Sequence, residues 1–296
     1  MRQSRGRGVL DADTVAAYLA RIGVDDPGEP SLDAMCALHR AHVERVPYEV
    51  LDIQLGRPTS ADPLAAVERI VRGRGGYCVQ LNGGFSTLMT ALGYEVVPHG
   101  ALMQAGAAPP GPGLPSAPHL APTIVIDGEH WLADVGLGDG LHDPLPLREG
   151  TFRQGPFTFR LGPSRTLPGG WRFDHDERGS IRGMDFTLEH APQRDFDDWH
   201  VELATSPESR LVRALTVMRR EATGADQLTG CMLRRVDADG RTVTEVADRE
   251  AWFDVVTGKF GLRLDDLDAA DRARLWDIVR RAHEAWLEAK ARRRSA

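Results

Sequence analysis

Apolar residues recur at helical spacing through the first third of the chain. The pattern predicts one helix that begins near Asp11 or Asp13 and ends at Gly23. A second helix is expected to follow the capping residue Ser31 and to end before Pro47. Two more are predicted over residues 63–71 and from about 78 to 92, with a short extended segment over 47–52. Residues 1–93 are therefore predicted to form a helical domain.

After residue 93 the apolar period changes to two, which is typical of strands. Strands are predicted at residues 94–97, 100–103, 123–126, 130–135, 158–161, 171–173 and 185–188. Asp127 and Gly128 form a hairpin-turn signal between two of them. The stretch 105–118 is rich in Pro, Gly and Ala and is predicted to be a loop. We expect an antiparallel barrel or sandwich over residues 94–204.

From residue 205 onward, segments with the helical period alternate with segments that have the strand period of two. Residues 211–217 fit a strand or a helix, and residues 227–236 with 241–246 fit a hairpin around 237–240. Helices are predicted over 250–260 and 267–289. Residues 205–296 are thus predicted to form an α/β unit, and the fold class of the whole chain is predicted to be α+β.

Composition and charge narrow the possible functions. The chain has 296 residues, of which 42% are hydrophobic and 27% charged, as in soluble globular proteins of two or three domains. Its net charge of -7 disfavours nucleic-acid binding, and the basic residues 290–294 are interpreted as a solvated helix end. The sequence contains no run of about 18 apolar residues, so no membrane span is predicted. The N-terminus lacks the apolar segment of a secretory signal.

Three cysteines without CxxC spacing argue against a disulfide framework and against a zinc site. We expect a protein of the reducing cytoplasm. His39 and His42 lie three residues apart on a predicted helix, but no third ligand follows at a suitable spacing, so they are interpreted as ordinary helix residues and no metal is expected.

Cys78 has the most unusual sequence environment. Gly75 and Gly76 precede it and allow a sharp turn and a close backbone approach. The cysteine falls in the first turn of a predicted helix, where the positive end of the helix dipole favours a thiolate, and Arg72 and Arg74 are expected to act in the same direction. A nucleophilic cysteine is favoured; the alternative is a buried structural thiol.

A cysteine nucleophile needs a base and a group that orients the base. His119 directly precedes the strand predicted at 123–126, and Asp134 lies late in its hairpin partner. A tight turn at 127–128 would place both residues on neighbouring strands, where the carboxylate would fix the imidazole tautomer. His130 is a second candidate for the base, and Asp134 could instead cap a loop.

These residues resemble the arylamine N-acetyltransferases. The similarity rests on Arg74-Gly75-Gly76-Tyr77-Cys78, on a histidine followed by a strand, and on Asp134-Val135-Gly136. Further matches occur along most of the chain, at residues 18–23, 38–39, 46–49, 143–147 and 206–209. The resemblance implies a helical domain, a β-barrel and an α/β lid around a Cys-His-Asp core like that of cysteine proteases.

The resemblance also implies a ping-pong acyl transfer with Cys78, His119 and Asp134 as catalytic residues. The donor would be acetyl-coenzyme A or another acyl thioester, and the acceptor an arylamine, hydrazine or similar amine, with no permanently bound cofactor. Arg74 and Glu49 would form a supporting ion pair, and Gln80 and Asn82 would support the site. Tyr77, Gly136, Leu137 and Gly138 would contact the substrate or donor.

Three positions depart from the family pattern: Gln80 replaces a usual Glu, Val50 a usual Asn, and Leu137 a usual Phe. These changes lie near the cysteine while the triad is kept, which suggests the same chemistry on a different substrate. One alternative is an ansamycin amide synthase, which would take a polyketide chain from an acyl carrier protein and close it as a macrolactam. The same fold could serve a non-catalytic binding protein, and the triad alone would also fit a cysteine protease or a transglutaminase.

Overall fold

The computed structural model describes residues 10–104 and 116–295, and its N-terminal part is helical. Its elements are α1 (Ala12–Ile22), α2 (Leu32–Arg45), β1 (Tyr48–Glu49), α3 (Leu51–Leu55), α4 (Pro63–Val71) and α5 (Cys78–Ala91). Asp11 caps α1 by accepting a hydrogen bond from the Thr14 N–H, and Gly23 ends it with φ +69°. Ser31 caps α2 in the same way, and Pro47 follows its end. The predicted ends of both helices are confirmed. The predicted extended segment 47–52 is wrong in its second half, because α3 begins at residue 51.

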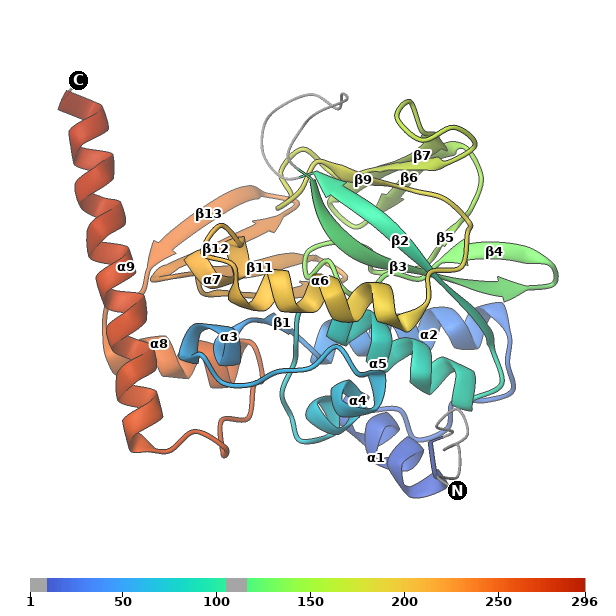
Figure 1. The fold of residues 1–296 in the computed structure, drawn as a ribbon, viewed down its shortest axis with the longest axis horizontal. Coiled ribbons are helices and arrows are strands. Elements are labelled where there is room, and N and C mark those ends of the chain that lie inside the picture. Colours follow the sequence, from blue (N-terminus) through green and yellow to red (C-terminus); the bar gives the residue numbers. More distant parts are fainter. Residues whose placement is uncertain (1–9, 105–115, 296) are drawn as a thin grey trace.

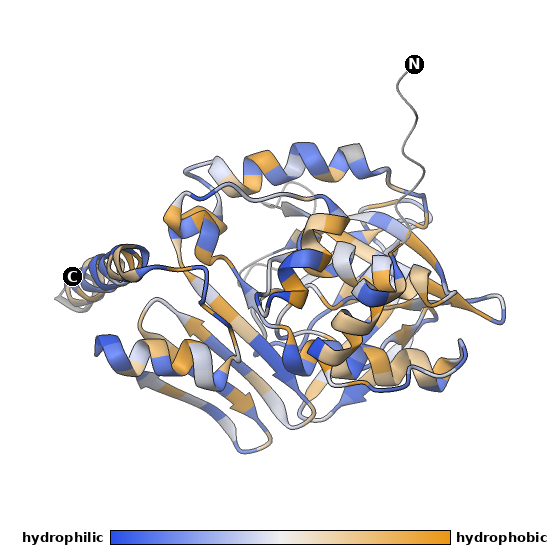
Figure 2. Ribbon diagram, turned by 90° about the horizontal axis from the view of Figure 1, so that it is seen from below, coloured by the Kyte–Doolittle hydropathy of each residue, from blue (hydrophilic) through white to orange (hydrophobic). Residues whose placement is uncertain are grey.

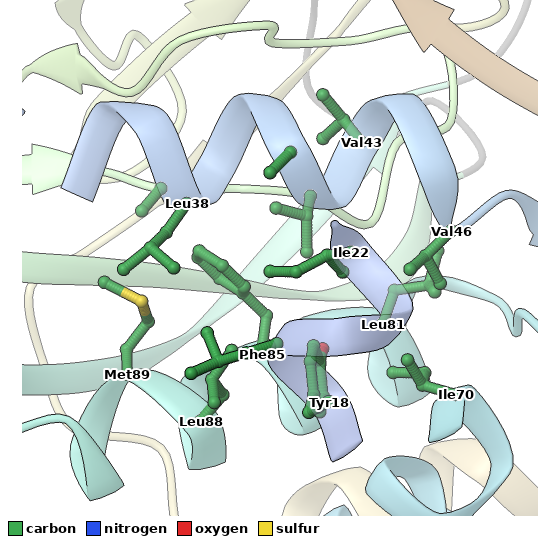
Figure 3. Close-up of a cluster of buried hydrophobic side chains, with 14 of the residues drawn as sticks. Tyr18, Ile22, Leu38, Val43, Val46, Ile70, Leu81, Phe85, Leu88 and Met89 are labelled. Carbon is green, nitrogen blue, oxygen red and sulfur yellow. The ribbon is translucent and has the colours of Figure 1, made fainter. Parts of the chain in front are cut away.

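The N-terminal helices share an apolar core (Figure 3). Tyr18 and Ile22 of α1, Leu38 of α2 and Phe85 of α5 are almost fully buried in it. The apolar face of α5, which carries the candidate nucleophile at its first residue, is thus held against α1, α2 and α4. Burial of this face fixes the position of the helix, since packing rather than propensity supplies most helical stability in proteins.

The middle of the chain forms a nearly closed antiparallel barrel (Figure 1). Its strands are β2 (Glu95–Gln104), β3 (Ser116–Ile126), β4 (Glu129–Leu132), β5 (Leu145–Pro146), β6 (Gly150–Gln154), β7 (Phe157–Pro163), β8 (Trp171–Asp174) and β9 (Gly183–Phe186). They pair in the order β5-β4-β3-β2-β9-β8-β7-β6. The predicted tight turn is confirmed: Asp127 and Gly128 both have positive φ, 52° and 80°, between β3 and β4.

Strand β3 extends further toward the N-terminus than predicted. Residues 105–115 of the predicted loop lie outside the described residues, but residues 116–118 belong to β3. The prolines fit because they occupy alternate positions of the ladder: Pro122 faces Pro98 and Pro118 faces Leu102. Two prolines opposite each other need no N–H in the β2–β3 ladder when they form a non-hydrogen-bonded pair. His119 therefore lies within a strand instead of at the end of a loop.

The C-terminal part carries a second sheet, in the order β1-β10-β11-β12-β13. Its strands after β1 are β10 (Thr216–Glu221), β11 (Gly224–Thr229), β12 (Met232–Asp237) and β13 (Gly240–Glu245). The hairpin around 237–240 is confirmed, but the single strand predicted at 227–236 is wrong. Gly230, with φ +56°, turns the chain there between β11 and β12.

Helices complete the C-terminal part of the molecule. They are α6 (Gln193–Thr205), α7 (Arg210–Arg213), α8 (Arg249–Asp254), the π-helical turn η1 (Val255–Lys259) and α9 (Ala269–Ser295). The sequence pattern assigns no element to α6, whose hydrophobic residues are interspersed with hydrophilic ones (Figure 2). Helix α9 runs along the outer side of the second sheet and projects beyond it (Figure 1). Over residues 10–104 and 116–295, no helix has the length and apolar character that a bilayer crossing needs.

Candidate active site

Cys78 is the first residue of α5, and a close backbone contact fixes the turn that leads into it. Gly75 lies against the Pro47 carbonyl, where a Cβ atom would come within 1.9 Å of the oxygen. The Glu49 N–H donates to the Gly76 carbonyl at 2.9 Å, which ties β1 to the same turn. The thiol is only 6% exposed. These contacts explain why glycine is needed before the cysteine: a side chain at residue 75 would displace the start of the helix.

His119 and Asp134 form the hydrogen bond expected of a base and its orienting group. His119 Nε2 donates to Asp134 Oδ2 at 2.6 Å, and both side chains are fully buried. Burial by itself lowers the pKa of His119, but the Asp134 carboxylate and then Cys78 outweigh it and raise the pKa to about 10. The other ring nitrogen, Nδ1, has no hydrogen-bond partner of ordinary geometry among the described residues. Nδ1 is therefore the nitrogen available to take a proton from the thiol.

Asn82 and Gly136 connect the Asp134 carboxylate to helix α5. Asn82, one turn into α5, donates to Asp134 Oδ1 at 2.8 Å and accepts from the Val135 N–H at 2.9 Å. The Gly136 N–H donates to the same Oδ1 at 2.8 Å. A Cβ atom at Gly136 would lie 2.6 Å from the Asn82 amide nitrogen and 2.9 Å from the Cys78 Cα. The loop after β4 can thus approach the nucleophile only with glycine at this position.

The arginines before Cys78 both have carboxylate partners. Arg72 is largely exposed and lies 4.0 Å from Glu68, its neighbour on the preceding turn. Arg74 is buried and pairs with Glu49 at 3.2 Å and with Asp266 at 2.6 Å. The charge of Arg74 is therefore already balanced by carboxylates.

The Arg74–Glu49 pair belongs to a larger buried network. Arg69 of α4 pairs with both Glu49 and Asp52, and its Nε donates to the Gly75 carbonyl at 2.6 Å. Although burial raises the pKa of Glu49, Arg69 and Arg74 lower it to about 2. The network therefore fixes the carbonyl of Gly75, three residues before the nucleophile, through charged hydrogen bonds.

We expect Glu49→Gln to destabilise the protein by about 3 kcal/mol, because it leaves two buried guanidinium groups without their shared carboxylate. Urea unfolding followed by circular dichroism would measure the change. Glu68→Gln is the matched control: the Glu68–Arg72 pair is about 70% exposed on both sides, and its loss should change stability by less than about 0.5 kcal/mol.

The pH dependence gives a second check on Glu49. A carboxylate whose pKa is lowered from 4.5 to about 2 stabilises the fold above pH 4.5 and loses this contribution as the pH falls toward 2. The Glu49→Gln variant should lose less stability than the parent protein over that range. Equal losses in both proteins, or equal effects of the two substitutions at neutral pH, would contradict the assignment.

Gln80 and Tyr77 connect the first turn of α5 to its surroundings. The Gln80 carbonyl accepts from the Tyr77 N–H at 3.3 Å, and its amide donates to Thr59 Oγ1 at 2.5 Å and to the Ser60 carbonyl at 3.0 Å. A glutamate could not donate these last two bonds. The Tyr77 hydroxyl bonds His200 of α6, and the two rings stack. Both residues thus stabilise the start of α5.

A cavity of about 150 Å³ opens beside the thiol. Among the predicted site residues, Cys78, His119, Gly136 and Leu137 line it, whereas Tyr77 and Gly138 do not belong to the lining set. The sequence reasoning missed the rest of the lining: Tyr48, Met103, Ser180, Ile181, Arg210, Leu211, Ala214, Thr216, Met218, Gln227 and Thr229. They come from elements that only the tertiary fold brings together, and no local motif indicates them.

Three further histidines that the sequence singles out have different partners. His130 Nδ1 bonds the Thr123 hydroxyl at 3.1 Å. His39 Nδ1 bonds the His142 carbonyl and His42 Nδ1 bonds the Tyr18 hydroxyl, both at 3.0 Å. Within residues 10–104 and 116–295, no three His, Cys, Asp or Glu side chains gather as metal ligands would. The three cysteines are free thiols.

Comparison with known proteins gives consistent matches. A sequence profile for a family described as N-acetyltransferase matches residues 31–269. The arylamine N-acetyltransferase of Mycolicibacterium smegmatis is 32% identical over 283 residues, which cover 90% of this chain and 98% of that protein. The proansamycin X synthase of Amycolatopsis mediterranei is 29% identical over 197 residues, which cover 64% of this chain and 72% of that protein.

The fold is similar to that of solved structures. A structure of the Mycobacterium marinum arylamine N-acetyltransferase in complex with CoA matches with a TM-score of 0.80 and 26% identity. The match covers 90% of this chain and 99% of that one. The predicted fold class, a helical part, an antiparallel barrel and a C-terminal α/β part, is confirmed.

Proposed function

Because the chain belongs to the arylamine N-acetyltransferase family, we propose that it transfers an acetyl group from acetyl-coenzyme A to an aromatic amine through a thioester on Cys78. The observation that carries this proposal is the His119–Asp134 pair, buried beside a thiol at the start of a helix. A non-catalytic binding protein would have no need of a histidine with a pKa raised to about 10 next to a cysteine.

In the first half-reaction, His119 Nδ1 takes the thiol proton and Cys78 attacks the carbonyl carbon of the acyl thioester. The tetrahedral oxyanion forms near the start of α5, where the Cys78 N–H and the helix dipole stabilise negative charge. When the intermediate collapses, the C–S bond to coenzyme A breaks and the leaving thiolate takes the proton from His119. The acetyl group then remains on Cys78.

In the second half-reaction, the amine nitrogen attacks the Cys78 thioester and passes its proton to His119. The bond to Cys78 breaks, and an amide leaves the cavity. Asp134 keeps its charge throughout and holds the Nε2 proton of His119 in place. A cavity of about 150 Å³ with partly apolar walls suits an aromatic ring, since an apolar cavity of about that size binds benzene.

The test is to isolate the first half-reaction. Incubation with acetyl-coenzyme A in the absence of an amine should add one acetyl group to the intact protein, and peptide mapping should place it on Cys78. Addition of an arylamine should remove it with formation of one equivalent of amide. Acetylation at Cys36 or Cys231, or no acetylation at all, would refute the proposal.

A macrolactam-forming amide synthase is the second candidate, favoured by the similarity to a proansamycin X synthase. That match covers a smaller part of both chains than the match to the mycobacterial acetyltransferase. Efficient acylation of Cys78 by acetyl-coenzyme A would support the first candidate. Acylation only by a long-chain carrier thioester would support the second.

A further inference from the structure

Strand β13 forms an open edge of the C-terminal sheet. It is the last strand in the order β1-β10-β11-β12-β13, and no strand of the described ranges pairs with its other side (Figure 1). Natural sheets usually protect such an edge with proline, lysine or a bulge, because unpaired N–H and C=O groups bind further strands. β13 contains neither proline nor lysine, and it pairs with β12 residue by residue, without a bulge. The edge can therefore accept another strand.

The backbone groups on this open side belong to the odd-numbered residues of β13. At the end of the β12–β13 ladder, the Val246 N–H donates to the Cys231 carbonyl at 2.7 Å. Pairs along an antiparallel ladder alternate between ones that exchange hydrogen bonds and ones that do not. The even-numbered residues of β13 therefore bond β12. The N–H and C=O groups that point away from the sheet are those of Arg241, Val243 and Glu245.

The sequence of β13 is complementary to itself in an antiparallel pairing. If two copies pair about Val243, this residue faces its own counterpart, Thr242 faces Thr244, and Arg241 faces Glu245. Opposite charges and β-branched residues directly across two strands both stabilise the pair. In this register the outward-pointing backbone groups of the two copies also face each other. A two-fold interface requires this kind of self-complementary surface.

Helix α9 presents exposed apolar side chains beside the same edge. His283 Nε2 donates to Glu245 Oε1 at 2.9 Å, and the Trp286 ring stacks on the His283 ring with 5.7 Å between centroids. Trp286 and Leu287 are each 40% exposed, and the helix projects beyond the sheet in this direction (Figure 1). A strand added to β13 would extend the sheet toward this part of α9.

We propose that β13 pairs with β13 of a second copy of this chain, antiparallel and in register about Val243, so that the two C-terminal sheets become one. The Arg241–Glu245 pair then occurs twice, once on each side of the two-fold axis. A second copy is favoured over an unrelated strand because it supplies both opposite charges at once. This assembly does not depend on the catalytic chemistry.

Sedimentation equilibrium tests the proposal. With increasing concentration, the mass should rise from the 32.5 kDa of one chain toward twice that value. Arg241→Glu would place like charges opposite each other at both ends of the pairing, and Glu245→Arg would do the same with the other sign. Each variant alone should raise the dissociation constant about tenfold, since two cross-strand pairs change from attraction to repulsion.

An equal mixture of these two variants is the decisive sample. A mixed pair again has opposite charges at both positions, so the dissociation constant should return close to that of the parent protein. Mixing does not repair a folding defect in either chain, and recovery therefore reports the contact itself. A mixture that associates as weakly as its components would contradict the proposed register.

Arg153→Glu is the matched control, because Arg153 is exposed on β6, the last strand in the order of the other sheet. It makes the same charge change and should leave the dissociation constant unaltered. Val243→Pro should abolish association and leave the hairpin intact, since the Val243 N–H points away from β12. Association that survives Val243→Pro, or a mass of 32.5 kDa at every concentration, would refute the proposal.

Discussion

Cys78→Ala is expected to lower kcat/KM for acetyl transfer by at least about a thousandfold, because the acyl group then has no residue to carry it. The alanine variant should also fail to gain an acetyl group from acetyl-coenzyme A. The substitution removes one buried sulfur atom, so unfolding by urea should show only a small loss of stability. Thiol release from acetyl-coenzyme A in the presence of an arylamine measures the rate.

The matched control for this variant is Cys231→Ala. Cys231 is also buried, 1% exposed, but it packs in the apolar cluster under the C-terminal sheet. Burial raises its pKa to about 11, which keeps the thiol protonated. We expect this variant to lose some stability and to keep its turnover. Retention of transfer by Cys78→Ala would show that the acyl group passes directly from donor to amine.

Asp134→Asn is expected to reduce kcat by about ten-thousandfold, as in other triads in which the amide imposes the wrong histidine tautomer. Asp134 Oδ1 accepts from two donors, Asn82 Nδ2 and the Gly136 N–H. The amide oxygen of an asparagine must therefore occupy the Oδ1 position, which leaves its NH₂ group facing His119. His119 Nε2 would then have to accept a hydrogen bond, and Nδ1 would carry the proton. An imidazole with a protonated Nδ1 cannot deprotonate the thiol.

The pH dependence of stability distinguishes this tautomer effect from simple unfolding. The pKa of His119 is raised from 6.5 to about 10, so its protonation stabilises the fold fully below pH 6.5. That contribution is lost as the pH rises from 6.5 to about 10. Removal of the Asp134 charge should flatten the decline, measured by urea unfolding across this range. An unchanged decline would contradict the assigned cause.

Asp185→Asn controls for the loss of a buried carboxylate elsewhere. Asp185 is 3% exposed in the barrel and pairs with Arg172 at 2.8 Å, away from the triad. We expect this variant to be less stable and to retain kcat when assayed well below its melting temperature. If both variants lost kcat in proportion to stability, the role of Asp134 would be structural.

Local signals in the sequence predicted the parts of the fold that local chemistry determines. Helix α4 covers the predicted residues 63–71 because Asp62 caps it and Pro63 suits its first position. The turn at 127–128 needs positive φ, which Asp and Gly tolerate. The His119–Asp134 pair was predictable because a short hairpin brings these two residues together. The turn before Cys78 was predictable because its glycines form a recognisable motif.

Contacts between distant segments were not predictable in this way. The prolines at the start of β3 led to the prediction of a loop, and only the pairing with β2 shows that they fit a strand. Helix α6 has few apolar residues, and its Phe196 is buried only because it packs on the cluster around Cys78. Nothing in the sequence around Arg69 distinguishes this arginine from other helix residues. Its role depends on the tertiary fold, which brings Glu49 and Asp52 to it.

The bond between Arg74 and Asp266 has a consequence for how the protein becomes active during synthesis. Asp266 accepts from Arg74 at 2.6 Å, and the nearby Arg263 N–H donates to the Gly73 carbonyl at 2.9 Å. Both contacts bind the turn before Cys78 to the segment 263–266. A ribosome makes the segment with Cys78 long before residues 263–266, and domains generally fold in that order. A nascent chain can therefore contain Cys78, His119 and Asp134 while the contacts that support the turn before Cys78 are still missing. The thiol would reach its final environment only when the last part of the chain has left the ribosome.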